Sequence, residues 1–325
     1  MALRSKLNPL LRANNDTGFG TTSAGNTGRF VNRNGSFNVR RRGVAFWNRY
    51  SVYNILLSMN ATKFILIVFS FFIVTNILFT FIYIAIGIDQ FSGFAETEVL
   101  KKDAELFFFS AQTFTTVGYG RINPIGFSAN LVASIEALAG LLSFAVMTGL
   151  LYGRFVRPRA NLLFSDFAVV APYKDITGLM FRFVSIKDKH SLTDVSVRVN
   201  VGMNVMENGR PVYKFYDLEL ERNRIDSLPM NLTVVHPIDE KSPLYNYNAE
   251  DMEVADVELY VLVRAYDDVY NSTVQQRTSY IYNEIVHGEK FVPMYHESAD
   301  GNTTIVDLDK INETIEMKLP ALKPV

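Results

Sequence analysis

The chain has 325 residues, of which 48% are hydrophobic and 13% aromatic, with 32 Lys and Arg against 33 Asp and Glu. This length suggests about two domains, and the net charge of -1 gives no support for a protein that coats nucleic acid. The sequence contains no cysteine, which excludes disulfide scaffolds, thiolate metal sites and cysteine nucleophiles.

The chain begins with a polar stretch, which is followed by an amphipathic one. The first forty or so residues are rich in Gly, Asn, Thr and Ser, which predicts a flexible arm over residues 1–45. Residues 46–59 (FWNRYSVYNILLSM) mix aromatics, Arg49 and aliphatics at roughly helical spacing. This pattern predicts a slide helix in the membrane interface over residues 46–60. The alternative is a helical extension of the next segment.

Two long apolar segments predict membrane-spanning helices. Residues 64–88 contain no charge over 25 residues, and at about 1.5 Å per residue such a helix crosses a hydrocarbon core of about 30 Å. The second segment is Phe127–Phe155, where Glu136 is the only charge between residues 122 and 153. The sequence therefore predicts a protein with two membrane spans.

The charges beside the spans predict their orientation. Nine Lys and Arg precede the first span, Lys63 at its edge not counted, and Arg154, Arg157 and Arg159 lie at the end of the second. The segment between the spans carries five acids against three bases. By the positive-inside rule both termini are cytoplasmic. We therefore expect a multi-pass protein of the cell (inner) membrane.

The segment between the spans contains a shorter apolar run and a glycine-containing motif. Residues 104–114 are too few to cross a bilayer, which predicts a re-entrant or extracellular helix. The motif that follows is Thr116, Val117, Gly118, Tyr119 and Gly120. Irregular backbone at membrane depth is tolerated where it lines a watery cavity. Two glycines at this spacing let successive carbonyls point one way, as in a potassium selectivity filter.

This motif also predicts an assembly. Main-chain carbonyls and the Thr116 hydroxyl would hold K⁺ at Thr116, Val117, Gly118 and Tyr119. One strand of carbonyls cannot surround an ion, so four chains are required and we expect a homotetramer. K⁺ is then the permeant ion and no cofactor is expected. We assign residues 61–157 to a two-span α-helical pore domain with a re-entrant pore helix.

The rest of the chain, residues 158–325, predicts an all-β domain. Short alternating runs separated by turns include residues 193–200 (TDVSVRVN), 212–220 and 257–265 (VELYVLVRA). Asn208 and Gly209 form a hairpin signal. This spacing of short strands favours a β-sandwich.

Three further segments narrow the family. They are residues 157–170 (RPRANLLFSDFAVV), 236–245 (HPIDEKSPLY) and 274–291 (VQQRTSYIYNEIVHGEKF). With the filter motif, they resemble the inward-rectifier potassium channel (Kir) family, and its prokaryotic branch in particular, over residues 46–291. The resemblance implies passive K⁺ conduction without catalysis, through a pore joined to a cytosolic immunoglobulin-like β-sandwich that regulates it.

On the second span, one helical face carries residues at intervals of three, four or seven, namely Ala137, Phe144, Thr148, Tyr152 and Phe155. The resemblance implies that this face lines the cavity and that Phe155 forms a cytoplasmic gate, which closes by dewetting. The alternative is a set of lipid-facing or interhelical aromatics. Gly149 matches the hinge position of the family, but a close-packing role in a membrane helix fits equally well.

Inward rectification requires acidic rings that hold cytoplasmic polyamines or Mg²⁺. In the family pattern, the mid-cavity acid of strong rectifiers is replaced here by Phe144. Of the cytosolic acids, one matches Asp194 and another is replaced by Arg264, which reverses the charge. We therefore expect weak rectification at most.

Three residues near the filter depart from the family pattern or lack an obvious partner. Gln112 replaces the usual pore-helix glutamate, and Arg121 follows the filter, where its charge would lower the local K⁺ concentration and so the conductance. Glu136 is an intramembrane acid and needs a partner. It braces the filter through Gln112 or a backbone group, pairs with Arg121, or is a protonated and inert side chain.

Charges on the cytoplasmic side allow two interpretations each. Lys63, Arg154, Arg157 and Arg159 match the phosphoinositide site of the family, or they anchor the chain by the positive-inside rule alone. In residues 265–271 (AYDDVYN), Asp267 and Asp268 line a cytosolic constriction or form an ordinary turn.

Two other functions are open to test. The spans could merely tether a binding or signalling β-domain, but a tether does not need Thr116, Gly118 and Gly120. Alternatively, the β-domain is a ligand receptor that gates the channel. We find no P-loop, zinc signature or nucleophile elbow, and the four histidines show no ligand spacing.

Overall fold

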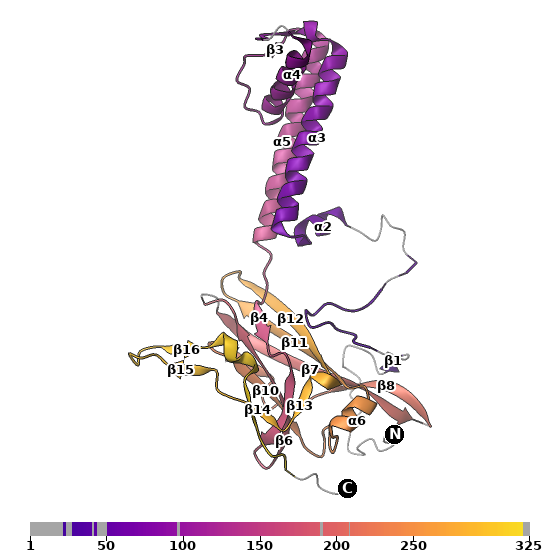
Figure 1. Ribbon diagram of the computed structural model, residues 1–325, viewed down its shortest axis with the longest axis vertical. Helices are drawn as coiled ribbons and strands as arrows, with labels where there is room; N and C mark the ends of the chain where they lie inside the picture. Colours follow the sequence, from indigo (N-terminus) through magenta and orange to yellow (C-terminus); the bar gives the residue numbers. More distant parts are fainter. Residues whose placement is uncertain are drawn as a thin grey trace. The chain divides into compact units, whose positions relative to one another are not determined.

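The computed structural model describes residues 22–23, 28–40, 42–43, 51–95, 98–188, 191–207 and 209–320. The chain divides into two compact units, which Figure 1 shows. Arg41–Arg157 forms a helical unit, and Met1–Arg40 together with Pro158–Val325 forms a β-rich unit.

In the helical unit, two apolar helices are long enough to cross a membrane. They are α3 (Ala61–Ile86, 26 residues) and α5 (Phe127–Phe155, 29 residues). α3 ends two residues before the predicted boundary, because Gly87 adopts a φ of 114° that side chains disfavour. The prediction of a two-span module is confirmed.

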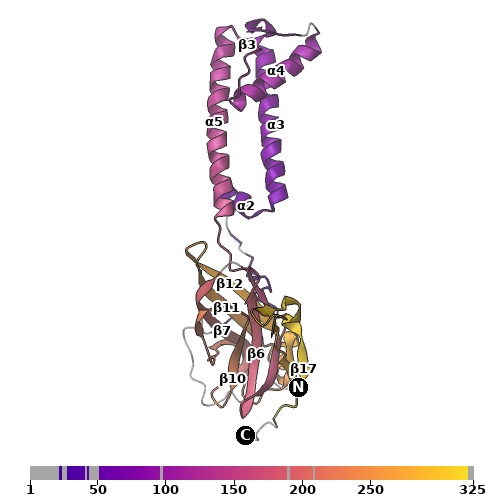
Figure 2. The same cartoon turned by 90° about the vertical axis from the view of Figure 1, so that its left-hand side faces the viewer.

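A shorter helix, α4 (Val99–Phe114), packs against both long helices, at the end of the unit where β2 (Phe91–Ser92) and β3 (Asn123–Pro124) pair (Figure 2). The 3-10 turn η1 (Ile88–Gln90) links α3 to β2. α4 begins five residues before the predicted run of 104–114 and includes Lys101 and Lys102. The prediction placed the start of this helix too late, because it relied on apolar residues and the first turns of α4 contain polar ones.

The predicted slide helix corresponds to α2 (Val52–Ser58), which is shorter than the range 46–60. Ser51 Oγ accepts a hydrogen bond from the Asn54 amide at 3.4 Å and so caps the helix start. Met59 and Asn60 have extended ψ angles of 161° and 148°, which separate α2 from α3. α2 is therefore a distinct helix, and the alternative of a helical extension is wrong. Residues 46–50 lie outside the described part of the chain.

Three aromatic rings hold the helices of this unit together. Tyr83 of α3, Phe91 of β2 and Phe109 of α4 meet edge to face, with ring centroids 5.3–5.5 Å apart. Leu106, Ile122, Ala129 and Ala133 are buried beside them. This cluster fixes α4 against the two spans.

The β-rich unit contains two facing sheets. One joins β8 (Arg210–Asp217), β7 (Leu192–Glu207), β11 (Glu258–Asp267) and β12 (Ser272–Ile281) in that order, with β1 (Thr22–Ser23) beside β8 and β9 (Arg224–Ser227) beside β7. The other joins β10 (Leu232–Ile238), β6 (Ile176–Ser185), β5 (Ala168–Tyr173) and β13 (Ile285–His287), with β4 (Leu162–Phe164) beside β6.

Apolar residues from both sheets pack into one core, which includes Phe183, Val195, Val201, Leu259 and Tyr280. All strand pairs named above are antiparallel except β13 and β5. The β7–β8 hairpin closes at the predicted position, where Glu207 pairs with Arg210 and Gly209 has a φ of 75°. The β-sandwich prediction is confirmed.

Smaller elements complete the unit: α6 (Ala249–Val254), the 3-10 turns η2 (Tyr282–Glu284) and η3 (Leu308–Asn312), the pair β14 (Glu289–Phe291) and β17 (Thr314–Glu316), and the pair β15 (Tyr295–Glu297) and β16 (Thr304–Val306).

Part of the predicted flexible arm packs on the sandwich. The Phe30 and Val31 amides donate hydrogen bonds to the carboxylate of Glu258, and the Arg29 guanidinium pairs with Glu284 at 2.9 Å. Val31 is only 2% exposed. The prediction of flexibility is therefore wrong for residues 29–31. It was based on local composition, which contains no information about the distant Glu258 carboxylate that accepts these main-chain donors. Residues 1–21, 24–27, 41 and 44–45 of the predicted arm lie outside the described part.

Candidate ion-conduction pathway

The filter motif follows α4 directly and has an alternating backbone. Thr116, Gly118 and Gly120 have φ angles of 59°, 55° and 80°, whereas Val117 and Tyr119 between them keep negative φ. Such alternation turns successive carbonyls toward one side and the side chains toward the other. Thr116 adopts this conformation without being glycine, which marks a position where backbone geometry overrides local preference.

Main-chain hydrogen bonds tie the start of the filter to the end of the pore helix. The Val117 and Gly118 amides both donate to the Gln112 carbonyl, at 2.9 and 3.3 Å. The Thr116 amide donates to the Thr113 carbonyl at 3.0 Å. Gln112 thus contacts the filter through its main chain, which any residue type at this position supplies.

Glu136 is fully buried between the three main helices of its unit. Its carboxylate accepts hydrogen bonds from the hydroxyls of Tyr83 on α3 and Ser110 on α4. Ser110 Oγ also lies 3.0 Å from Asn76 Oδ1. Glu136 is therefore paired with two hydroxyls, and the predicted pairing with Arg121 or the Gln112 side chain is wrong. The Glu136 hydrogen bonds therefore join α5 to α3 and α4, and they do not contact the filter loop directly.

Arg121 forms an ion pair with Glu105, with 2.5 Å between Nη2 and Oε1. Glu105 Oε2 also accepts a hydrogen bond from the Ala95 amide at 3.3 Å. The Glu105 side chain is 10% exposed, so this pair is shielded from water on one side. The negative charge of Glu105 offsets the repulsion of K⁺ that we expected from Arg121.

The predicted cavity and gate residues all lie on α5, where the aromatic ones are exposed in the single chain. Phe144, Tyr152 and Phe155 are 73%, 69% and 78% exposed. Thr148 Oγ1 donates a hydrogen bond to the Phe144 carbonyl at 2.9 Å. These aromatic side chains are thus free within the chain to face lipid, another subunit or a pore.

Two glycines of α5 behave differently. A Cβ at Gly149 would meet no atom within 4 Å, so this glycine makes no close contact inside the described chain. A Cβ at Gly140 would lie 1.9 Å from the Phe114 carbonyl oxygen at the end of the pore helix. Gly140, which the sequence reasoning did not single out, is the close-packing glycine that lets α5 approach the pore helix.

The four basic residues assigned to lipid have different surroundings. Arg154 donates to the main-chain carbonyls of Leu56 at 2.5 Å and Met59 at 2.8 Å, and its guanidinium lies 4.6 Å from the Phe64 ring centroid. Lys63 and Arg157 are exposed in the helical unit, and Arg159 is exposed in the β-rich unit. Arg154 thus binds the end of α2. Of the three basic residues assigned to lipid in the helical unit, Lys63 and Arg157 are the exposed ones.

Asp194 lies at an irregularity of the larger sheet. The β7–β11 register shifts between Arg264 and Tyr266, and Asp194 on the opposite strand has a φ of 47°, which indicates a β-bulge. Its carboxylate pairs with Arg224 at 2.6 Å. Arg264 is exposed on β11. Arg224 therefore lowers the attraction of Asp194 for cations.

Both other acids of this region accept hydrogen bonds, Asp267 from within its own turn and Asp268 from strand β7. Asp267 is 1% exposed, and its carboxylate accepts hydrogen bonds from the Val269 and Tyr270 amides. Asp268 accepts one from Thr193 Oγ1 at 3.3 Å. The Asp267 contacts favour the turn interpretation of residues 265–271, although this carboxylate is buried and not solvated.

The partners of Glu136 and Arg121 were missed at the sequence level. Tyr83, Ser110 and Glu105 carry a weak signal, since each is polar within or beside an apolar helix. Their pairing depends on how α3, α4 and α5 pack, and this packing is not readable from spacing along the chain.

Two membrane-length helices, a shorter helix between them and a loop with alternating φ define the pore subunit of an ion channel. Comparison with known proteins agrees with this class. Residues 162–324 match the family model described as the inward rectifier potassium channel C-terminal domain, and residues 70–157 match a model described as ion channel.

Individual relatives carry the same description. The inward rectifier potassium channel Kirbac3.1 of Paramagnetospirillum magnetotacticum is 32% identical over 88% of this chain and 95% of its own length. Inward rectifier potassium channel irk-1 of Caenorhabditis elegans is 26% identical over 67% of this chain and 42% of its own. For inward rectifier potassium channel 18 of Homo sapiens the values are 30%, 65% and 50%.

The chain therefore belongs to the inward-rectifier potassium channel family, in its prokaryotic branch. This is a family of membrane ion channels, not of enzymes. The animal relatives are matched over only about half of their length.

Proposed function

We propose that four copies of this chain form a passive, K⁺-selective pore without a cofactor. The observation that carries the proposal is the backbone of residues 116–120. Positive φ angles at Thr116, Gly118 and Gly120 alternate there with negative ones, and hydrogen bonds join this loop to the end of α4. K⁺ binds to carbonyl oxygens of residues 116–119 and to the Thr116 hydroxyl. A single chain offers these oxygens from one side only, so the site is complete only in the tetramer.

Potassium flux from liposomes that contain the purified full chain tests this function. K⁺ efflux is expected to exceed Na⁺ efflux and to be blocked by Ba²⁺. Gly118→Asp is expected to abolish the flux, because a side chain is strained at a φ of 55° and places a charge at the filter. Gly209→Asp is the matched control, since Gly209 has a φ of 75° in a hairpin of the β-rich unit. Flux that persists in Gly118→Asp contradicts the filter assignment.

We further propose that conduction is gated at the cytoplasmic end of α5 and rectifies weakly. Phe155 and Tyr152 from four chains would form a constriction that dewets when narrow. Phe144 offers no charge to a cytoplasmic blocker, and the pairing of Asp194 with Arg224 supports a shallow voltage dependence. Lys63, Arg157 and Arg159 supply positive charge to anionic lipid headgroups. Both termini are cytoplasmic in this arrangement.

A further inference from the structure

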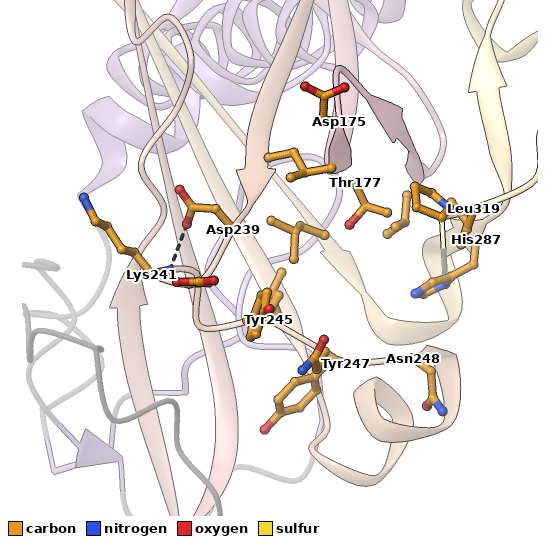
Figure 3. Close-up of a pocket in the computed structure, with 16 residues that line it drawn as sticks. Asp175, Thr177, Asp239, Lys241, Tyr245, Tyr247, Asn248, His287 and Leu319 are labelled. Atoms are coloured by element: carbon orange, nitrogen blue, oxygen red, sulfur yellow. Dashed lines mark hydrogen bonds between the residues drawn. The ribbon is translucent and has the colours of Figure 1, made fainter. Parts of the chain in front are cut away.

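The β-rich unit contains a cavity that the conduction pathway does not use. Its volume is ≈ 470 Å³, within the range of about 300–1,000 Å³ typical of small-molecule sites. The turn between β5 and β6, the loop after β10, the end of β13 and residues 319–320 enclose it (Figure 3). The cavity therefore lies between segments that are far apart in the sequence.

The HPIDEKSPLY segment builds one wall of this cavity. His236 is buried, with Nδ1 2.6 Å from the Glu219 carbonyl and Nε2 2.8 Å from Ser242 Oγ. Burial lowers the pKa of His236, so the neutral ring donates through Nδ1 and accepts from the serine. Ser242 Oγ also accepts from the Leu244 amide at 3.1 Å. These bonds hold the loop in one shape before any ligand arrives.

The floor of the cavity is apolar, and an imidazole lies beside it. Val170, Ile238 and Leu244 are at most 8% exposed and form the floor. His287 points its ring into the cavity (Figure 3), and neither nitrogen makes a hydrogen bond of normal geometry with the described residues. Burial lowers the pKa of His287, against a smaller opposing contribution from the main chain of Ile285. The neutral ring thus contributes an uncharged aromatic surface to the wall of the cavity.

Charged residues around the cavity are mainly acidic. Asp175, Asp239 and Glu240 line it together with one base, Lys241. Tyr245 and Tyr247 add aromatic faces, which attract cations. An apolar floor with an acidic and aromatic rim suits a ligand that is apolar at one end and positively charged at the other.

We propose that this cavity binds a small organic cation with an apolar ring, the ring on the floor beside His287 and the cationic group near Asp175 and Glu240. This binding does not depend on ion conduction, because every residue involved belongs to the β-rich unit.

Three indole compounds that differ mainly in charge test the ligand class on the purified full chain by isothermal titration calorimetry. Tryptamine is the cation, tryptophol the neutral analogue and indole-3-acetate the anion. Tryptamine is expected to bind at least about fivefold more tightly than tryptophol, and indole-3-acetate most weakly. Equal affinity for all three, or no binding of tryptamine, overturns the proposal.

Variants test the position of the site. Asp175→Lys is expected to weaken tryptamine binding at least about tenfold and tryptophol binding much less, since the substitution reverses a charge at the rim. Thr177→Trp is expected to weaken both by filling the cavity. Asp226→Lys makes the same charge change on exposed β9 and is expected to leave both affinities unchanged. Tryptamine binding that is insensitive to Asp175→Lys, or equally sensitive to Asp226→Lys, overturns the assignment to this cavity.

Discussion

Glu136 illustrates how a single residue joins the helices of the pore unit. An acid without exposure inside a membrane protein needs hydrogen-bond donors, and here Tyr83 and Ser110 supply them from two different helices. The sequence indicated that a partner was required. It did not indicate which one, because both donors lie more than twenty residues away.

We expect Tyr83→Phe to destabilise the channel by about 1–3 kcal/mol, because one carboxylate oxygen of Glu136 then lacks a donor in a buried site. Thermal unfolding of the purified protein in detergent measures this. Ser134→Ala is the control, since Ser134 Oγ donates to the Asn130 carbonyl of its own helix in an exposed position. Equal melting temperatures for Tyr83→Phe and Ser134→Ala would contradict the role of the Glu136 contacts.

The Arg121–Glu105 pair makes a second prediction at the residue scale. Glu105→Gln is expected to reduce single-channel K⁺ conductance at low ionic strength, because the unpaired Arg121 then repels K⁺ beside the filter. Adding Arg121→Gln in the same chain is expected to restore the conductance. The effect should fade at high salt, where the field is screened. A double variant no better than Glu105→Gln would show that repulsion by Arg121 is not the cause.

Arg154 connects two elements, α2 and α5. Its guanidinium satisfies carbonyls at the end of α2 and lies on the Phe64 ring, so α2 is bonded to the residue that precedes the predicted gate, Phe155. The basic pattern along the chain suggested a lipid ligand here. Packing changed this interpretation, because the carbonyls of a short helix end compete with lipid for the same donors.

We expect Arg154→Leu to raise amide hydrogen exchange in residues 52–58 by about tenfold or more, since each charge-assisted bond contributes about 1.5–3 kcal/mol. Arg157→Leu removes an exposed charge three residues away and is expected to change exchange in α2 little. Hydrogen exchange followed by mass spectrometry on the full chain in lipid measures both. Similar exchange in the two variants would argue against the Arg154 contacts with α2.

At the scale of the whole molecule, rectification of the proposed tetramer depends on which side chains its four copies present to the pore. Phe144→Asp is expected to place four carboxylates in the cavity and to reduce outward current in the presence of cytoplasmic spermine at least about tenfold. Phe144→Asn introduces a side chain of nearly the same size as Asp but without its charge, and is expected to leave rectification weak. Bilayer recordings with and without spermine distinguish the two. Steep spermine block of the unmodified channel would itself contradict weak rectification.

Most of the architecture was readable along the chain. Uninterrupted apolar length identifies α3 and α5, and alternation and a hairpin signal identify the sandwich. Thr116, Gly118 and Gly120 identify the loop of alternating φ that we propose as the filter. These features depend on local chemistry: the thickness of a bilayer, the period of a strand and the backbone freedom of glycine.

Partner choice was decided by packing. The partners of Glu136, Arg121 and Arg154, and the docking of residues 29–31 on Glu258, join segments that the sequence leaves far apart. The same holds for the cavity beside His287, which forms only where four separate segments meet. A charged or polar residue inside an apolar segment indicates that a hydrogen-bond partner is needed. The three-dimensional fold then determines which of many candidates lies within hydrogen-bonding distance.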